Sequence, residues 1–344
     1  MHPELAHPFG LTINSYGFMI MVGFLIATAV AVRRGKTIGI PADLIMDVGI
    51  YSMIMGIVGA KINHMLEYSS QYQGSFEHMA DFSSGEIWLI GVIVGAIIPF
   101  IVVSYFQKKR QIAAGASTEQ ATRKFSPARL MGYVLVDIVC AFLGGCAANM
   151  LINHFSDIKS WTSGFVFYGG LITAVATGIL VIRLRKQKVL PVADIAAPSI
   201  MLGLAFGRVG CFLYGCCYGK ATDFVCAVTF PPKSAAYWDG DQQTFVTPYP
   251  VHPTQLYETI AGLVLFFILS RIWKSRKRDG EVLAWLGILY PVWRFSVEFL
   301  RGDNELFWFG ALTFSQGVSI LIFVASVLWL VSLKKRNPAQ QITS

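Results

Sequence analysis

Charged residues are scarce in this sequence of 344 residues, where they make up only 14%. A soluble protein carries about a quarter charged residues, so this scarcity argues against a soluble globular fold. Hydrophobic residues make up 54% of the chain, which is typical of a polytopic membrane protein. The net charge of +8 is compatible with a nucleic-acid partner. Because the basic residues lie at the ends of apolar runs, however, we expect no nucleic acid.

The sequence also lacks a basic N-terminal leader and any pair of cysteines in CxxC spacing. Its first residues, MHPELAHPFG, contain no lysine or arginine, so we expect no cleavable signal peptide. The pattern CxxxxCC, formed by Cys211, Cys216 and Cys217, does not match the paired spacing of structural zinc sites. We therefore expect neither a metal ion nor another cofactor.

Nine apolar runs are long enough, or nearly so, to cross a bilayer as helices of about 20 residues. Only helices satisfy their own backbone in lipid at these lengths. The sequence therefore predicts an all-α polytopic membrane protein with about nine transmembrane helices, in one domain over residues 1–344. The runs cover residues 15–32, 43–66, 86–106, 129–152, 164–182, 193–214, 254–273, 281–300 and 313–333.

Clusters of basic residues follow the odd-numbered runs and predict the orientation. If all nine runs cross the membrane, these clusters lie on one side, which by the positive-inside rule is the cytoplasm. We therefore expect the N-terminus outside and the C-terminus inside. The largest outer segment, residues 215–253, is rich in aromatic residues and proline, which predicts an ordered cap. The clusters are RRGK (33–36), QKKR (107–110), RLRKQK (183–188), KSRKR (274–278) and KKR (334–336).

Five polar motifs lie at the outer ends of the runs, and together they predict a site that faces outward. Arg208 and Arg294 carry most weight, since an arginine within the membrane costs at least about 2.5–3.5 kcal/mol. Glu298 is four residues from Arg294 and shares its helix face. A guanidinium presents planar donors that fit a phosphate, so we expect a lipid head group as ligand. The motifs are NSYGFM (14–19), FVFYGGLI (165–172), GRVGCF (207–212), HPTQLYE (252–258) and WRFSVEFLRGD (293–303).

Each motif also allows a purely structural interpretation. We favour a site because separate structural needs would not gather at one side of the membrane. Two other classes of protein stay open: a lipid or solute transporter, and a thiol–disulfide redox protein in which Cys216 or Cys217 is reactive. The structural alternatives are an ion pair for Arg294 and Glu298, contact with outer head groups for Arg208, an interfacial aromatic belt for Tyr16 and Tyr168, helix entry for His252, and a helix–helix hydrogen bond for Glu258.

In content and order, these motifs make the chain resemble the prolipoprotein diacylglyceryl transferases of the bacterial inner membrane. The resemblance covers most of the chain outside residues 67–128. It implies transfer of a diacylglyceryl group from phosphatidylglycerol to the lipobox cysteine thiol of a preprolipoprotein. A thioether forms, glycerol phosphate leaves, and the active site faces the periplasmic leaflet. The matching segments are LTINSYGFM, FYGGLI, GRVGCF…GCCYG, HPTQLYE and RFSVEFLR.

The same resemblance implies roles for individual residues. Arg208 matches the arginine that binds the phosphatidylglycerol head group, Arg294 matches a second essential arginine, and Glu298 matches the acid one turn beyond it. Tyr16 and Gly219 match further functional positions. We add Tyr168 as a catalytic candidate. The remaining candidates for substrate binding are Gly169, Gly170, Gly207, Gly210, Cys211, His252, Gln255, Tyr257, Glu258 and Arg301.

Three features depart from the family pattern. The family has a histidine where this chain has Tyr168, so either the base lies elsewhere or Tyr168 orients the substrate. An asparagine and a glutamate of the signature are replaced by Cys211 and Cys216, which we expect to pack or to form disulfides. Four outer cysteines, Cys226 included, allow three pairings. Nine runs exceed the usual seven, and the surplus is best placed as an extra helix and linker in residues 67–128.

Overall fold

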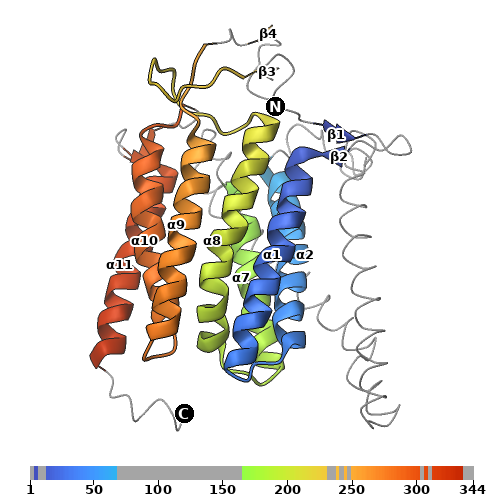
Figure 1. Cartoon of the computed structure of the whole chain (residues 1–344), viewed down its shortest axis with the longest axis vertical. Helices are drawn as coiled ribbons and strands as arrows, with labels where there is room; N and C mark the ends of the chain where they lie inside the picture. Colours follow the sequence, from blue (N-terminus) through green and yellow to red (C-terminus); the bar gives the residue numbers. More distant parts are fainter. Residues whose placement is uncertain are drawn as a thin grey trace. The chain divides into compact units, whose positions relative to one another are not determined.

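Long helices make up the described part of the chain, and they begin and end close to the predicted runs (Figure 1). Seven of the nine predicted segments are confirmed as helices. The other two, residues 86–106 and 129–152, lie outside the described residues, as does the extra segment at 67–128 apart from its first residue, Glu67, which ends α2. The helices are α1 (Ser15–Thr37), α2 (Ala42–Glu67), α7 (Phe165–Leu184), α8 (Val189–Tyr214), α9 (Thr254–Ser275), α10 (Glu281–Glu298) and α11 (Phe314–Lys335).

The chain divides into two units in this computed structural model. The first unit joins Met1–Ile45 to Lys188–Ser344, and the second is Met46–Gln187. The structure describes residues 4–6, 13–67, 165–230, 238–239, 244–245, 249–302, 306–308 and 312–335.

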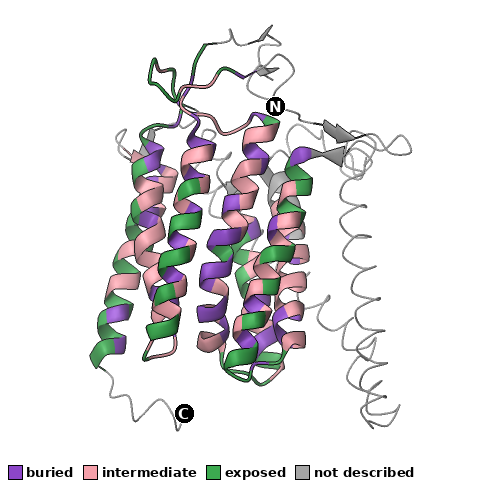
Figure 2. Ribbon diagram, in the orientation of Figure 1, coloured by how far each residue is buried: buried purple, intermediate pink, exposed green. Residues whose placement is uncertain are grey.

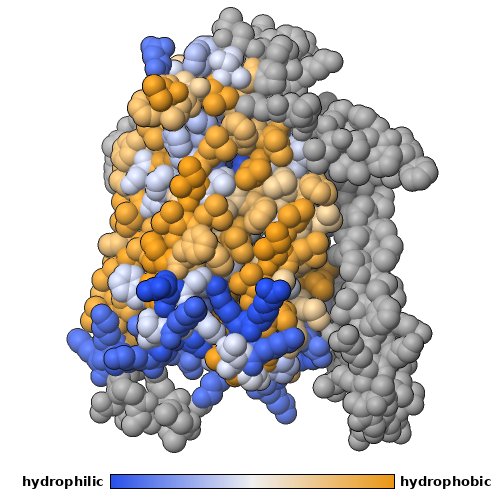
Figure 3. Space-filling model, viewed as in Figure 1, coloured by the Kyte–Doolittle hydropathy of each residue, from blue (hydrophilic) through white to orange (hydrophobic). Residues whose placement is uncertain are grey.

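Four of the described helices, α1, α8, α9 and α11, are long and apolar enough to cross a membrane. The eighteen residues of α10 include Glu281, Arg294 and Glu298, which lower its hydropathy. Large apolar side chains are widely exposed, for example Phe267 and Leu321 at 64% each. Such a surface suits contact with lipid better than contact with water. Figure 3 shows it as a broad hydrophobic band.

The helix α8 packs against α1, α9 and α10 in the first unit, and α11 packs against α10. Buried residues follow α8 along its length (Figure 2). Small residues allow this close packing, as is usual between membrane helices. A Cβ added at Gly23 of α1 would lie 2.7 Å from Cβ of Phe206. One added at Gly262 of α9 would lie 3.1 Å from the carbonyl oxygen of Met201.

Basic residues gather at one end of the first unit, and Figure 3 shows hydrophilic side chains beyond the hydrophobic band at this end. They lie in the last turns of α1, α9 and α11, while α8 and α10 begin at the same end. Asp194, which is fully buried in α8, accepts hydrogen bonds from the backbone N–H groups of Gly280 (2.8 Å) and Leu283 (2.9 Å). It thereby caps the N-terminus of α10, where a negative charge is favourable.

The helices α2 and α7 pack together in the second unit through small residues. A Cβ added at Gly170 would lie 2.7 Å from the carbonyl oxygen of Gly56. Thr173 donates a hydrogen bond of 3.1 Å to the carbonyl oxygen of Met55. At the other end of α7, Arg185 pairs with Asp47. Gly170 of the FYGGLI motif thus serves helix packing within this unit.

Short antiparallel strands accompany the helices, and the all-α prediction did not include them. Isolated bridges also join Gly219 to Arg301, and Val251 to both Ala221 and Val228. Within the predicted cap, Phe230 and Val251 form a small buried core. The strand pairs are β1 (Glu4–Ala6) with β2 (Ile13–Asn14), β3 (Trp238–Asp239) with β4 (Thr244–Phe245), and β5 (Leu306–Trp308) with β6 (Leu312–Thr313).

Candidate active site

Three arginines converge on one buried carboxylate at the end of the first unit opposite the basic clusters. Nε of Arg208, in the last two turns of α8, lies 2.6 Å from Oε2 of Glu258. Nη1 of Arg294, near the end of α10, lies 3.6 Å from Oε1 of Glu258. Nη1 of Arg301, three residues beyond α10, lies 3.8 Å from the same oxygen. Glu258 itself is in the second turn of α9, and its side chain is only 1% exposed.

Arg208 reaches this carboxylate with one edge of its guanidinium. Its side chain is 15% exposed. No ion pair or hydrogen bond joins its two terminal nitrogens to another residue in the described ranges. A guanidinium held in this way keeps a pair of parallel donors for an oxyanion.

Glu298 forms the second carboxylate of the cluster. Its Oε2 lies 2.9 Å from Nη1 of Arg294, so these two residues form the i,i+4 ion pair that the sequence allowed as a structural alternative. Its Oε1 accepts a hydrogen bond of 2.8 Å from the hydroxyl of Thr313. Nη2 of Arg294 in turn donates to the hydroxyl of Ser315, at 3.2 Å. The start of α11 therefore fixes both members of the pair.

The HPTQLYE segment supports the loop that follows α8. The Thr254 hydroxyl donates to the carbonyl oxygen of Cys217 at 2.8 Å, and the Gln255 amide donates to that of Cys216 at 2.7 Å. Nδ1 of His252 and the hydroxyl of Tyr257 lie 3.3 Å apart. The candidates in this motif other than Glu258 thus contact the loop or one another, while Glu258 contacts the arginines.

Gly219 lies where two other segments approach its backbone closely. A Cβ there would lie 2.6 Å from Cβ of His252 and 2.7 Å from the carbonyl oxygen of Leu300. The backbone of Lys220 donates to that same oxygen at 2.8 Å. Gly219 is therefore required for the packing that holds Arg301 beside Glu258.

The other glycine candidates of α8 differ in their surroundings. A Cβ at Gly210 would lie 3.2 Å from Cα of Tyr16, so this glycine brings α8 and α1 together. At Gly207 a Cβ would meet no described atom within 4 Å.

Tyr16 is 42% exposed, and its ring centroid lies 6.4 Å from that of Tyr214. Tyr168 belongs to the first turn of α7 in the second unit, together with Gly169 and Gly170.

Comparison with known proteins decides the family of the chain. A family model described as prolipoprotein diacylglyceryl transferase matches residues 3–132 and 92–332. The chain belongs to this transferase family. It is 28% identical over 329 residues to phosphatidylglycerol–prolipoprotein diacylglyceryl transferase 2 of Clostridium perfringens, covering 95% of this chain and 94% of that protein.

Two further relatives carry the name phosphatidylglycerol–prolipoprotein diacylglyceryl transferase. The protein of Clostridium tetani is 28% identical over 305 residues, which are 88% of this chain and 86% of the relative. The protein of Geobacillus kaustophilus is 39% identical over 187 residues, 53% of this chain and 67% of the relative. The resemblance inferred from the motifs is therefore confirmed, and the chain is a multi-pass protein of the bacterial inner membrane.

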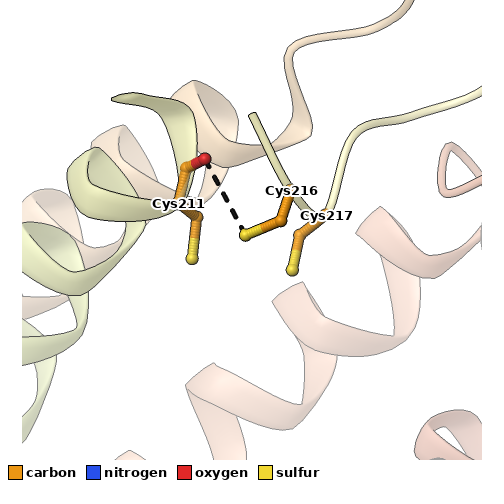
Figure 4. Close-up of side chains that lie close together, drawn as sticks. All are labelled: Cys211, Cys216 and Cys217. Carbon is orange, nitrogen blue, oxygen red and sulfur yellow. Dashed lines mark hydrogen bonds between the residues drawn. The ribbon is translucent and has the colours of Figure 1, made fainter. Parts of the chain in front are cut away.

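This member of the transferase family has a cluster of three cysteines beside its arginines. Their sulfur atoms all lie within 4.8 Å of one another (Figure 4). The end of α8 brings them together. Gly215 adopts a left-handed conformation with φ of 85°, so its N–H and that of Cys216 both donate to the carbonyl oxygen of Cys211, at 2.8 and 3.1 Å. This is a common way for a helix to end.

The sequence left two alternatives open for these cysteines, packing and disulfide formation. Cys211, Cys216, Cys217 and Cys226 are all free, so the disulfide alternative is not what the structure contains. Hydrogen bonds from Cys211 and then Cys216 lower the pKa of the Cys217 thiol, and the positive charges of Arg208 and Arg301 lower it further.

The site also contains residues that the motifs had not indicated. Thr313 and Gln316 form a capping box at the start of α11: the Gln316 amide oxygen accepts from the Thr313 N–H at 3.0 Å, and the Thr313 hydroxyl accepts from the Gln316 N–H at 3.3 Å. The T-x-x-Q pattern was visible in the sequence as a helix start. Its further contact with Glu298 depends on the packing of α10 against α11.

Proposed function

We propose that this protein transfers the diacylglyceryl group of phosphatidylglycerol to the lipobox cysteine thiol of a prolipoprotein. The product is a thioether and the leaving group is glycerol phosphate, as in the first step of lipoprotein maturation. The observation that supports assigning this function to a particular site is the convergence of Arg208, Arg294 and Arg301 on Glu258.

The charges of this cluster support a phosphodiester as ligand. Three guanidiniums and the two carboxylates of Glu258 and Glu298 leave one positive charge unbalanced. Phosphatidylglycerol carries a single negative charge on its phosphate, which matches that excess. We assign the head-group phosphate to the terminal nitrogens of Arg208.

Arg294 and Glu298 are assigned to the reaction itself. Negative charge develops on the phosphate oxygen as the carbon–oxygen bond breaks, and a fixed guanidinium stabilises it at no cost of reorganisation. The contacts of Arg294 with Glu298 and Ser315 hold it in place beforehand. Tyr16 and Tyr168 stay candidates for orienting the lipid and the peptide.

The orientation proposed for the chain follows from the two ends of the first unit. One end carries the basic residues of α1, α9 and α11, and the arginine–glutamate cluster is at the other. By the positive-inside rule the basic end faces the cytoplasm. We therefore propose nine spans in one transmembrane domain, an external N-terminus, a periplasmic cap over residues 215–253, and an active site open to the periplasmic leaflet.

A transfer assay with purified full-length protein tests the function. Protein in phosphatidylglycerol vesicles is mixed with a lipobox peptide, and the release of glycerol phosphate is measured. We expect peptide-dependent release by the wild type. Arg208→Ala should lower the rate about 100- to 1000-fold, the usual loss when a group that stabilises developing charge is removed.

Two matched variants define what the result means. Arg271→Ala removes an exposed arginine near the other end of α9, and its rate should equal that of the wild type. Arg208→Lys keeps the charge but not the planar pair of donors, so it should recover only part of the activity. Equal rates for Arg208→Ala and Arg271→Ala would contradict the assignment of the phosphate to Arg208. No release by folded wild-type protein would contradict the function.

A further inference from the structure

The three cysteines at the end of α8 are arranged as ligands for one metal ion. In a tetrahedral zinc–thiolate site with bonds of about 2.3 Å, the sulfur atoms lie about 3.8 Å apart. The sulfurs of Cys211, Cys216 and Cys217 are all within 4.8 Å of one another, so small side-chain rotations would bring them to the separation found in a zinc–thiolate site. Figure 4 shows the three side chains side by side, one from α8 and two from the following loop.

The backbone of this cluster is held from several directions. The carbonyl oxygens of Cys216 and Cys217 accept hydrogen bonds from Gln255 and Thr254, and the Cys216 N–H donates to the carbonyl of Cys211. A metal ion therefore does not have to order the loop in order to bind. The unpaired CxxxxCC spacing argued against zinc, but the turn at Gly215 brings the second and third cysteines back over the first.

A tetrahedral ion held by three protein ligands keeps one open position, which is the mark of a catalytic rather than a structural site. Cys211 is three residues beyond Arg208 on α8, so the two Cα atoms are separated by about 4.5 Å along the helix axis. A ligand in the open position would thus lie beside the place assigned to the lipid phosphate. The substrate with the matching chemistry is a thiol.

We propose that Cys211, Cys216 and Cys217 bind a thiophilic divalent ion of the zinc class, and that the open position takes the acceptor cysteine thiol. This proposal rests on the transferase function above. The acceptor thiol loses its proton to solvent on binding, because a coordinating thiol is deprotonated outright. Its sulfur then attacks the glyceryl carbon. The sulfur–carbon bond forms as the carbon–oxygen bond breaks, and the electron pair leaves with glycerol phosphate; nothing is oxidised or reduced.

This arrangement gives one physical account of three substitutions relative to the family pattern. The histidine expected at position 168 is a tyrosine, and two polar positions of the signature are Cys211 and Cys216. A bound ion makes the acceptor thiolate without a histidine base, and it requires the additional cysteines. The loss of the histidine and the gain of the cysteines are then two parts of one change in how the acceptor thiol is activated.

The first experiment measures metal binding independently of activity. Full-length protein is purified in detergent, reduced, stripped with a chelator and titrated with Co²⁺, whose sulfur-to-metal charge-transfer absorption reports thiolate ligands. We expect one Co²⁺ per chain, displaced by Zn²⁺. Cys211→Ser, Cys216→Ser and Cys217→Ser should each weaken binding by more than about 100-fold, beyond the loss typical of outer-shell partners. The control Cys226→Ser, an exposed cysteine outside the cluster, should bind like the wild type.

The second experiment tests the open position. A lipobox peptide should change the Co²⁺ spectrum of the wild type, whereas the same peptide with serine in place of its cysteine should not. Metal-free protein should transfer at least about 100-fold more slowly, the contribution expected of proton removal from the nucleophile, and Zn²⁺ should restore the rate. Helical circular dichroism and the elution volume of each variant show whether it is folded.

The outcomes separate the two proposals. Absence of Co²⁺ charge transfer in folded wild-type protein, or equal binding by the cysteine variants, overturns the metal site. Full transfer by metal-free protein, or a spectrum that ignores the peptide thiol, overturns the role in acceptor activation. If the spectrum responds to the thiol but zinc-loaded protein releases no glycerol phosphate from phosphatidylglycerol, the metal site is supported and the transferase function is rejected.

Discussion

Replacing Glu258 by glutamine tests the arginine cluster most directly, because it removes the charge that three guanidiniums share and keeps the shape of the side chain. Glu258 is 1% exposed and lies 2.6 to 3.8 Å from nitrogens of Arg208, Arg294 and Arg301. Two unit charges about 4 Å apart interact by about 4 kcal/mol at an effective dielectric constant of 20. The three contacts are not additive, since each also offsets repulsion among the guanidiniums.

Removing one partner of a buried ion pair typically lowers the free energy of unfolding by about 3–5 kcal/mol, and we expect a loss of this size for Glu258→Gln. With about 2 °C per kcal/mol for a chain of this size, Glu258→Gln should lower Tm by about 6–10 °C. Thermal unfolding followed by tryptophan fluorescence in detergent measures this shift. Asp223→Asn, the same chemical change at an exposed loop residue, should leave Tm unchanged.

The lipid dependence makes this prediction specific to the site. In the variant a bound phosphate would supply the missing negative charge, so phosphatidylglycerol should raise its Tm more than that of the wild type. Phosphatidylcholine, whose head group has no net charge, should not discriminate between them. The reasoning would be refuted by a Tm equal to that of the wild type, or by equal stabilisation of both proteins by phosphatidylglycerol.

Two further substitutions test the packing around the site. Gly219→Ala places a methyl group 2.6 Å from Cβ of His252, so we expect a loss of about 1–3 kcal/mol in stability and slower transfer as Arg301 moves. Gly17→Ala is the matched control, because a Cβ there meets no described atom within 4 Å. Equal Tm values for the two variants would contradict this account. Asp194→Asn weakens the cap of α10 and should cost about 1–2 kcal/mol in thermal unfolding while transfer below Tm stays unchanged. A fall in transfer rate without a fall in Tm would instead connect Asp194 to the reaction.

The helices could be predicted from the sequence because lipid demands long apolar segments with polar ends. The start of α8 was placed too late, at residue 193 instead of Val189. The reason is Pro191, which reads as a helix breaker but is tolerated in the first turn of a helix, where no intrahelical donor is needed. The short strands were missed because pairings of two or three residues leave no periodic pattern.

The candidate site was predictable in its parts but not in its centre. The pairing of Arg294 with Glu298 follows from their spacing of four residues on one helix. Nothing in the HPTQLYE motif ranks Glu258 above its neighbours, because its role arises from helices that are distant in sequence. The cysteine cluster could not be predicted either, since it depends on the left-handed turn at Gly215 and on the positive φ of 61° at Cys217.

The cost of this cluster is itself an argument about its purpose. Apolar residues of similar volume usually serve stability at least as well as a buried ion pair, because charges lose their hydration on burial. The end of the first unit nevertheless holds three arginines with two glutamates, and Arg208 keeps terminal nitrogens that no residue of the described ranges engages. A structural network would be expected to balance its charges and satisfy its donors internally. An excess of one positive charge is instead what a site requires when its remaining partner, a lipid phosphate, arrives from the membrane.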